Sequence, residues 1–232
     1  NLSLSRLQGA DRSRRCQDGF DKFVSPGLSR VMAQKKNYHH GDLRQALLDA
    51  GLAMIEETGF GGLSLRKIAA RVGVSHAAPE HHFPTLKHLL SAMAAEGFVL
   101  FARAMGDERR HAAPAPVDQM RAAVRGYLHY AGTHPQLFRL MFTSNLLDWA
   151  DPALIAASAA GYQHLRDICA PAADRLNLTS DADRTGLEHL VWSQVHGQAQ
   201  LMIDNKLIDH ETGEPCPAPD HPVDLAGLLF RD

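Results

Sequence analysis

Apolar residues recur every three or four positions along most of the chain, which is the spacing of one face of an α-helix. The first such helix is expected to begin at Asp42, which makes a variant capping box with Gln45. Its apolar face consists of Leu43, Leu47, Ala50 and Met54. Glycines at positions 59, 61 and 62 then end the pattern. No stretch alternates persuasively between apolar and polar residues as a strand does, so the sequence predicts an all-α fold.

The helical pattern continues, with interruptions, almost to the end of the chain. A long helix is expected at 84–109, and the stretch AAPAP at 112–116 is the clearest linker. Beyond this linker the spacing predicts helices near 117–132, 135–147, 152–175, 181–205 and 222–230, with a proline-rich loop at 213–222. Residues 1–36 have no sustained apolar period, and we expect them to form a flexible N-terminal arm.

Between the first and the long helix, the sequence has the features of a helix-turn-helix. Two helices that cross steeply need a small residue where they meet, and Ala69 supplies it. Gly73 tolerates the positive φ of a tight turn, and Ser75 is placed to cap the next helix with its amides facing outward. The pattern predicts a support helix at 64–72 and a recognition helix at 75–82. A helical corner in an enzyme is the alternative.

The segments YHHGDLR (38–44), LSLRKIA (63–69), GVSHAAP (73–79) and HFP (82–84) resemble the N-terminal domain of TetR-family transcriptional repressors. Further along, WSQVHG (192–197) resembles the Trp-His-Gly signature of the ligand-binding domain in one subgroup. The resemblance implies a homodimer whose recognition helices enter successive major grooves of a near-palindromic DNA operator. It also implies a small-molecule effector that binds the C-terminal domain and releases the DNA.

This resemblance divides the chain after the arm into a helix-turn-helix DNA-binding domain at 37–84 and a larger helical domain for ligand binding and dimerisation at 85–232. Residues expected at the DNA are Tyr38, His39, Ser64, Arg66, Ser75, His76, Ala77, His81, His82 and Lys87. His76 and Ala77 would contact base edges, while the serines would cap helices and meet phosphates.

Three positions depart from the family pattern. Glu80 stands where a tyrosine usually contacts phosphate, and His81 stands where an arginine is usual. The usual lysine is replaced by Leu86, with Lys87 one position later. Because each change removes a cation or a donor, we expect weakened DNA binding that strengthens at acidic pH, where histidines gain charge. A second function stays open, that of a helical small-molecule-binding protein whose DNA-binding head is weakened or lost. An activator is also compatible with the sequence.

Candidates for a pocket that binds an apolar or aromatic effector are Tyr127, Phe138, Met141, Phe142, Trp149, Trp192 and His196. For each of them, ordinary core packing is the alternative. The segment 187–202 carries apolar groups on two faces, so both faces must be buried. One face is expected to line the protomer core and the other a partner. The residues expected at the dimer interface are Leu187, Leu190, Val191, Gln194, Gln198 and Leu201.

Charge is distributed unevenly along a chain whose formal net charge is −2. Residues 1–34 carry +3 and residues 35–90 carry +2, whereas residues 91–232 carry −7. A mildly basic front and an acidic back indicate that the front meets a polyanion.

Several other classes of protein are disfavoured. The cysteines at 16, 169 and 216 lie far apart and are odd in number, which favours reduced thiols and a cytoplasmic location over a disulfide or zinc framework. No apolar run reaches the roughly 20 residues of a membrane span. The sequence lacks the motifs of serine hydrolases, P-loop proteins and zinc proteases. We therefore expect no enzymatic activity, no cofactor and no metal site.

Overall fold

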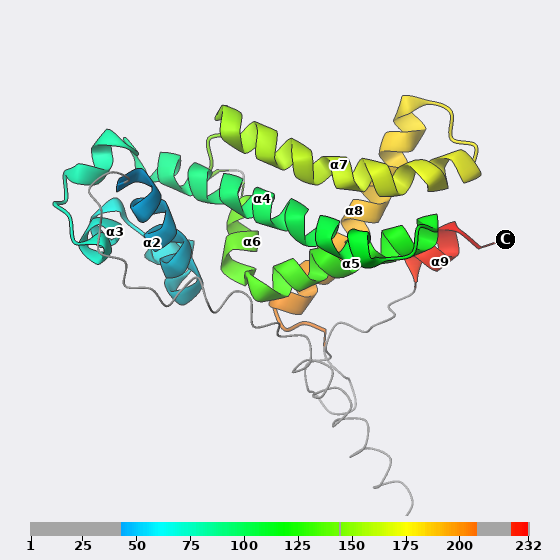
Figure 1. The fold of residues 1–232 in the computed structure, drawn as a ribbon, viewed down its shortest axis with the longest axis horizontal. Helices are drawn as coiled ribbons and strands as arrows, with labels where there is room; N and C mark the ends of the chain where they lie inside the picture. Colours follow the sequence, from blue (N-terminus) through cyan, green and yellow to red (C-terminus); the bar gives the residue numbers. More distant parts are fainter. Residues whose placement is uncertain (1–42, 144, 208–223, 232) are drawn as a thin grey trace, which may run out of the picture.

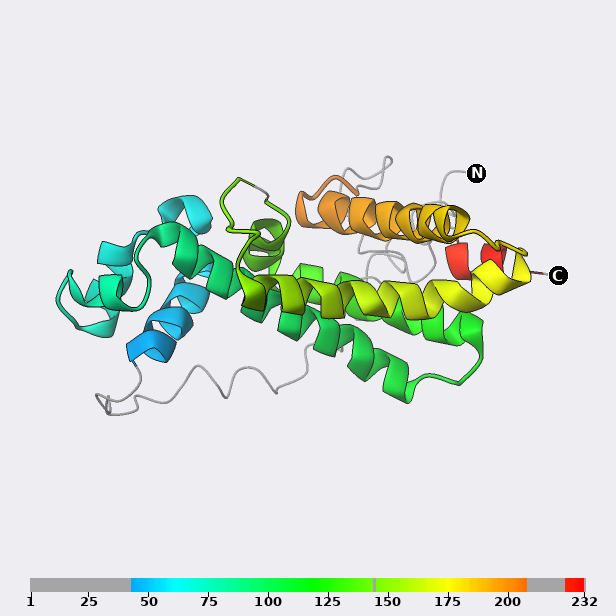
Figure 2. The same ribbon diagram turned by 90° about the horizontal axis from the view of Figure 1, so that it is seen from above.

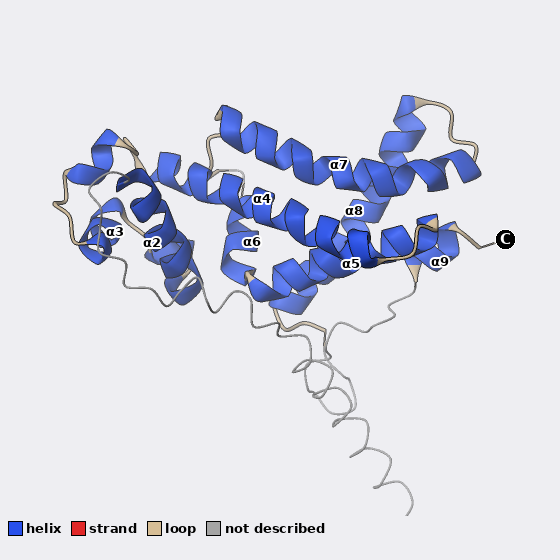
Figure 3. Cartoon of the chain, in the orientation of Figure 1, coloured by secondary structure: helices blue, strands red, loops and turns tan. Residues whose placement is uncertain are grey.

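The computed structural model describes residues 43–143, 145–207 and 224–231. These residues form helices joined by turns and loops, and no strand occurs among them (Figure 3), which confirms the all-α prediction. The helices are α2 (Leu43–Thr58), α3 (Leu65–Val72), α4 (Leu86–His111), α5 (Pro116–Thr133), α6 (Pro135–Met141), α7 (Pro152–Arg175), α8 (Asp181–Ile203) and α9 (Leu225–Leu229). Two short 3-10 helices are η1 (Phe60–Gly62) and η2 (Ala78–His81). The arm expected at 1–36, the Asp42 cap, Tyr38, His39 and the loop at 213–222 lie outside the described residues.

The N-terminal helices α2 and α3 form a head at one end of the elongated molecule, and α4 extends from this head along the body (Figure 1). Ser64 caps α3 as predicted, because its hydroxyl accepts from the N–H of Lys67 at 3.2 Å. Gly73 ends α3 with a φ of 81°, and its N–H donates to the carbonyl of Ala69 at 2.9 Å. Ala69 is fully buried at this corner. The helix-turn-helix corner therefore forms where the small residue and the glycine were expected to place it.

The recognition segment differs from the α-helix expected at 75–82. It forms a turn followed by the short 3-10 helix η2. Pro79 is the physical reason, since proline has no N–H for the Ser75 carbonyl and its ring would clash with that carbonyl in an α-helix. The N–H of Ala78 donates to the Ser75 carbonyl instead, at 3.1 Å. Residue Ala77, rather than Ser75, flanks the start of η2.

Helix α6 is also shorter than expected, because it ends at Met141 rather than near residue 147. The hydroxyl of Thr143 donates to the carbonyl of Arg139 at 2.7 Å, which occupies an acceptor of the last turn. The following loop is fastened to α4, where the buried Ser91 hydroxyl accepts from the N–H of Asp148 at 2.8 Å. This contact places Leu147, which belongs to the loop, in the hydrophobic core.

The body is a bundle around α4, which packs along both α5 and α7, while α8 packs against α5 and α7 (Figures 1 and 2). Gly126 permits a close approach between α4 and α5. A Cβ atom at this position would lie 2.6 Å from the carbonyl oxygen of Ala104 and 2.7 Å from the Cα of Met105. The backbones of α4 and α5 therefore touch where α5 has no side chain.

Among the described helices, α4 alone has the length and apolar composition of a membrane span. Half of its most apolar window is buried inside the bundle. This burial is what the central helix of a folded bundle requires.

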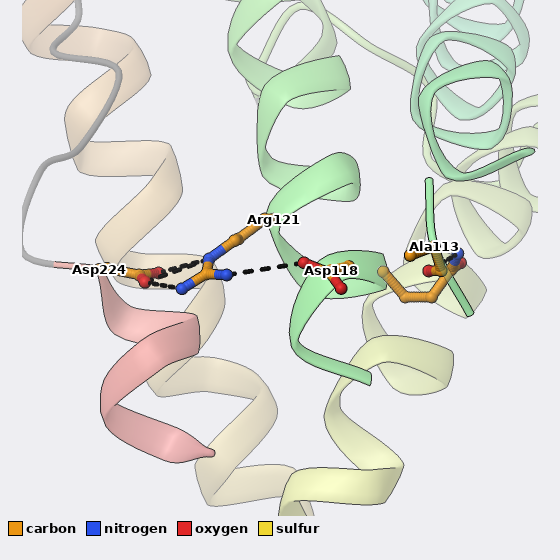
Figure 4. A network of polar contacts seen from close by, with 5 residues as sticks. Ala113, Asp118, Arg121 and Asp224 are labelled. Carbon is orange, nitrogen blue, oxygen red and sulfur yellow. Dashed lines mark hydrogen bonds and ion pairs between the residues drawn. The ribbon is translucent and has the colours of Figure 1, made fainter. Parts of the chain in front are cut away.

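At the far end of the body, α9 is joined to α5 by a charged cluster (Figure 4). The guanidinium of Arg121 donates through Nε to both carboxylate oxygens of Asp224, at 3.1 and 3.3 Å, and also pairs with Asp118 at 3.6 Å. The hydrogen bond to Asp224 is the main cause that raises the pKa of Arg121. The predicted helix at 222–230 is thus present as Leu225–Leu229 and anchored by the residue before it.

Candidate functional site

The head presents most of the residues expected at DNA on its surface. Exposed residues of this set are Arg66, Ser75, His76, Ala77, His81, His82 and Lys87. Ser64 is half-buried in its capping role. Glu80 is exposed within η2, between these residues in the sequence, so a carboxylate shares the segment that would approach phosphates.

Two other cations of α3, Lys67 and Arg71, are exposed but bonded to other groups of the head. The Arg71 guanidinium forms a bidentate pair with Glu57, at 2.6 and 2.7 Å, and this hydrogen bonding lowers the pKa of Glu57. The Nζ of Lys67 donates to the carbonyl of Gly62 at 2.7 Å. Leu86 is half-buried against the hydrophobic core. Its side chain therefore serves packing, whereas Lys87 beside it is exposed.

An apolar cavity of about 410 Å³ lies in the body, where α4, α5, α7 and α8 meet. Its lining residues are Phe98, Phe101, Met105, Ala123, Val124, Tyr127, Phe142, Trp149, Ile155, Ser158, Ala159, Gly161, Tyr162, Leu165, Ile168, Val191, Trp192 and Val195. Trp149 is 41% exposed and Ile155 is 49% exposed, so the cavity reaches the surface beside the start of α7. The volume is in the range of pockets that hold small organic molecules.

Four of the seven residues expected at the ligand line this cavity: Tyr127, Phe142, Trp149 and Trp192. The other three lie behind the wall. Phe138 and Met141 are fully buried in the core. His196 stacks on Phe138, with ring centroids 5.4 Å apart, and its Nδ1 lies 2.7 Å from the Tyr127 hydroxyl oxygen. These three residues therefore support the lining rather than form it.

Several lining residues were not singled out by sequence reasoning, chiefly Phe98, Phe101 and Met105 of α4 with Tyr162 and Leu165 of α7. They lie on apolar helix faces that have the spacing of core positions. Periodicity cannot separate a side chain that fills a core from one that faces a hollow. No local signal could have found them.

A hydrogen bond between α7 and α8 lies at the cavity wall. Tyr162 lines the cavity, and its hydroxyl donates to Oε2 of Glu188 on α8 at 2.7 Å. Burial, reinforced by this hydrogen bond, raises the pKa of Tyr162 to about 12. Glu188 is only 12% exposed, and its other oxygen lies 3.9 Å from Nε of Arg166. Tyr162 therefore stays protonated at neutral pH.

The residues expected at a dimer interface divide between two environments. Leu190 is 57% exposed and Leu201 is 46% exposed, with Gln194 half-buried. In contrast, Leu187, Val191 and Gln198 are buried within the protomer. The sequence assigned all six to one face, whereas the packing of α8 on α5 and α7 turns three of them inward. Helix α8 does have two apolar faces, but the outward one is narrower than expected.

Acidification is expected to destabilise the fold through three partly buried histidines, His134, His164 and His196. Burial lowers the pKa of each imidazole, and the neighbouring Arg109 contributes at His164. Because the folded pKa lies below the unfolded one, the unfolded chain binds protons first, and stability falls as pH drops through about 6.5. The thermal midpoint should be lower at about pH 5.5 than at about pH 7.5. His196→Gln should reduce this difference, and His189→Gln, at an exposed position, should preserve it. Equal pH dependence in the two variants would contradict the assignment.

Comparisons with known proteins agree with this arrangement. Residues 47–93 match the family model described as bacterial regulatory proteins, tetR family. Residues 120–220 match the model of the tetracyclin repressor-like C-terminal domain. A comparison with curated proteins gave no match.

Solved structures share the fold over most of the chain. A protein with unknown function from Rhodococcus sp. RHA1 is 28% identical, with a TM-score of 0.64, and the match covers 83% of this chain and 93% of that one. The multidrug binding protein EbrR, complexed with imidazole, is 22% identical with a TM-score of 0.51, covering 81% and 93%. The TetR family transcriptional regulator PfmR from Thermus thermophilus is 18% identical with a TM-score of 0.51, covering 66% and 84%. With both family models matching in order on a shared fold, the chain belongs to the TetR family of transcriptional regulators.

Proposed function

We propose that this protein is a ligand-responsive transcriptional repressor that binds a near-palindromic DNA operator as a homodimer. A small molecule that fills the cavity between α4, α5, α7 and α8 releases the DNA. Residues 37–84 act as the DNA-binding domain in this proposal, and residues 85–232 act as the ligand-binding and dimerisation domain.

The observation that carries the proposal is the course of α4. Near its start, Leu89 and Leu90 are buried in the hydrophobic cluster that also holds the apolar residues of the head. Further along, Phe98, Phe101 and Met105 line the cavity. A ligand that pushes on this second part of a stiff helix also shifts the first part, and with it the head. Release then follows from the ligand's preference for the displaced arrangement.

Helix α6 offers a second connection between cavity and head. The Glu56 carboxylate of α2 accepts from the N–H groups of Gln136 and Leu137, at 3.2 and 3.0 Å. These amides belong to the first turn of α6, where a carboxylate is favourable. The residue just after this helix, Phe142, lines the cavity. Movement of Phe142 is thus passed to the head through a charge-assisted contact.

Filling of the cavity should be visible in tryptophan fluorescence and should accompany loss of DNA binding. The chain has two tryptophans, and both line the cavity. Compounds that change this fluorescence in a saturable way should release the protein from a fluorescent DNA fragment taken from upstream of its own gene. Anisotropy titrations on that fragment measure the release.

A variant whose cavity is filled by a larger side chain is the matched control for ligand binding. A Cβ at Gly161 would lie 3.5 Å from the Phe101 ring, an ordinary contact, so Gly161→Leu should occupy the cavity without an initial clash. This variant should bind the DNA and ignore the compound. Release of DNA by a compound that leaves the tryptophan signal unchanged, or undiminished release in Gly161→Leu, would refute the mechanism.

The second candidate function, a ligand-binding protein with a weakened head, is favoured by the exposed Glu80 in η2. Glu80→Tyr is expected to tighten DNA binding about tenfold at low salt, because a carboxylate beside a phosphate is repulsive. Glu80→Gln removes the charge without adding a ring, so it should show the electrostatic part of this gain in DNA affinity. Leu86→Lys is not suitable as a second substitution beside Glu80→Tyr, because Leu86 is half-buried against the hydrophobic core. Unchanged affinity in both variants would mean that Glu80 does not face DNA.

A further inference from the structure

The wall of the cavity is almost entirely apolar and aromatic. Seven of its lining residues carry aromatic rings: Phe98, Phe101, Tyr127, Phe142, Trp149, Tyr162 and Trp192. Among the described residues that line it, none is charged. An ionised ligand would lose its hydration on entering without gaining a counter-charge from the wall. The wall therefore favours an uncharged aromatic or apolar body.

Of the polar groups in the wall, the Ser158 hydroxyl donates to the Ile155 carbonyl at 3.0 Å, whereas the Tyr162 hydroxyl is paired with a carboxylate. The phenol group of Tyr162 has a single hydroxyl hydrogen, and this hydrogen is donated to Glu188 at 2.7 Å. The phenolic oxygen is left with lone pairs, so it can accept a hydrogen bond from a ligand but has no hydrogen to donate.

The carboxylate behind Tyr162 adds a preference against anions. Glu188 lies one helical turn before Trp192, and the ring of Trp192 lies 6.3 Å from that of Tyr162. The ion pair between Glu188 and Arg166 is long, at 3.9 Å. Because Arg166 is 60% exposed, solvent screens its compensating positive charge. At Tyr162 the cavity wall thus presents an acceptor supported by negative charge.

The other tyrosine of the wall is already paired. The Tyr127 hydroxyl lies 2.7 Å from Nδ1 of His196, which stands behind the wall. Tyr127 is 5% exposed, compared with the half-buried Tyr162. Tyr162 is therefore the better placed of the two for a ligand.

From these contacts we infer that the effector is an uncharged aromatic or apolar compound with a hydroxyl or N–H donor, which bonds to the Tyr162 oxygen, and that carboxylates are rejected. This inference rests on the proposed function, because it takes the cavity as the effector site. It specifies the chemical class that the site selects.

Three naphthalene compounds with a common ring body separate the alternatives in calorimetric titrations of the full chain. The probes are 1-naphthalenemethanol, its methyl ether and 1-naphthoic acid. The alcohol offers a donor, the ether offers an acceptor alone, and the acid is an anion at neutral pH. We expect the alcohol to bind about tenfold more tightly than the ether, the gain from one good hydrogen bond. The acid should bind about a hundredfold more weakly than the alcohol, because its charge is desolvated beside Glu188.

Two conservative variants locate the preference. Tyr162→Phe should bring the alcohol and the ether to equal affinity, while Tyr127→Phe should keep the gap. Thermal unfolding of both variants checks that they are folded. A gap that closes in Tyr127→Phe and persists in Tyr162→Phe would overturn the assignment.

The outcomes also separate this inference from the proposed function. Binding of all three compounds without preference, or tightest binding of the acid, would overturn the inference and leave the cavity as a binding site. Failure of every probe to bind would count against the cavity itself, and so against both.

Discussion

Leu190→Glu is expected to convert the proposed homodimer into monomers and to weaken operator binding about a hundredfold, because the two heads would no longer be linked. Leu190 is the most exposed of the large apolar residues of the described chain, at 57%, and Leu201 lies on α8 as well, at 46%. A Cβ added to Gly197 of the same helix would meet nothing within 4 Å. This outward face of α8 is therefore apolar and open in the protomer. A carboxylate buried there without a partner would cost several kcal/mol.

Sedimentation velocity at micromolar concentration measures the dimer, and anisotropy on the operator fragment measures the loss of DNA binding. Leu228→Glu is the matched control, since Leu228 is 49% exposed and belongs to α9 rather than α8. It should remain dimeric. Val191→Glu is not a clean test, because Val191 is 1% exposed and lines the cavity, so the change would disrupt the protomer itself. A Leu190→Glu variant that stays dimeric would move the interface away from this face.

Gly126→Ala is expected to lower the free energy of unfolding by about 2–3 kcal/mol, as overpacking does. In an ordinary helix the same change stabilises by roughly 0.5–1 kcal/mol. The sign is reversed here because the new methyl group would meet backbone atoms of α4, at 2.6 Å from the Ala104 oxygen. Backbone atoms cannot turn aside as a side chain can, so α4 and α5 must separate. Since Met105 lines the cavity, the separation should also weaken ligand binding.

Urea unfolding at a fixed protein concentration measures this effect, with Gly186→Ala as its control. Gly186 lies in α8 with nothing within 4 Å of an added Cβ. Its replacement should leave stability unchanged or raise it by up to about 1 kcal/mol. Equal unfolding midpoints for the two variants would show that the helices accommodate the methyl group without cost.

The head could be predicted closely because its signals are local. Ser64 caps the helix that it precedes, and Gly73 ends it with the positive φ that glycine tolerates. Each of these effects depends on residues within one helical turn. The α-helix that the motif predicts at 75–82 is wrong, because Pro79 lacks the N–H that an α-helix needs there, and this signal is equally local.

The site in the body could be predicted only in part from the sequence. The aromatic residues Tyr127, Phe142, Trp149 and Trp192 were expected at a ligand and do line the cavity, but whether they bind one stays a prediction. Phe138 was expected at the ligand on the same grounds, but it is fully buried in the core. Which aromatic residue faces a hollow depends on how far apart four helices stand, and no single helix contains that information.

By itself, the sequence determined that this chain is all-helical, where most of its helices lie, and that it carries the helix-turn-helix of a TetR-family regulator. These features follow from hydrophobic period, caps and breakers, which act between neighbours in the chain. The tertiary structure alone decided which residues of α4 line the cavity, that Leu190 faces outward while Val191 faces inward, and that Tyr162 meets Glu188. The physical reason is that burial and pairing are properties of packed helices. The distances between those helices are set by contacts such as Gly126 against α4, which join residues far apart in the sequence.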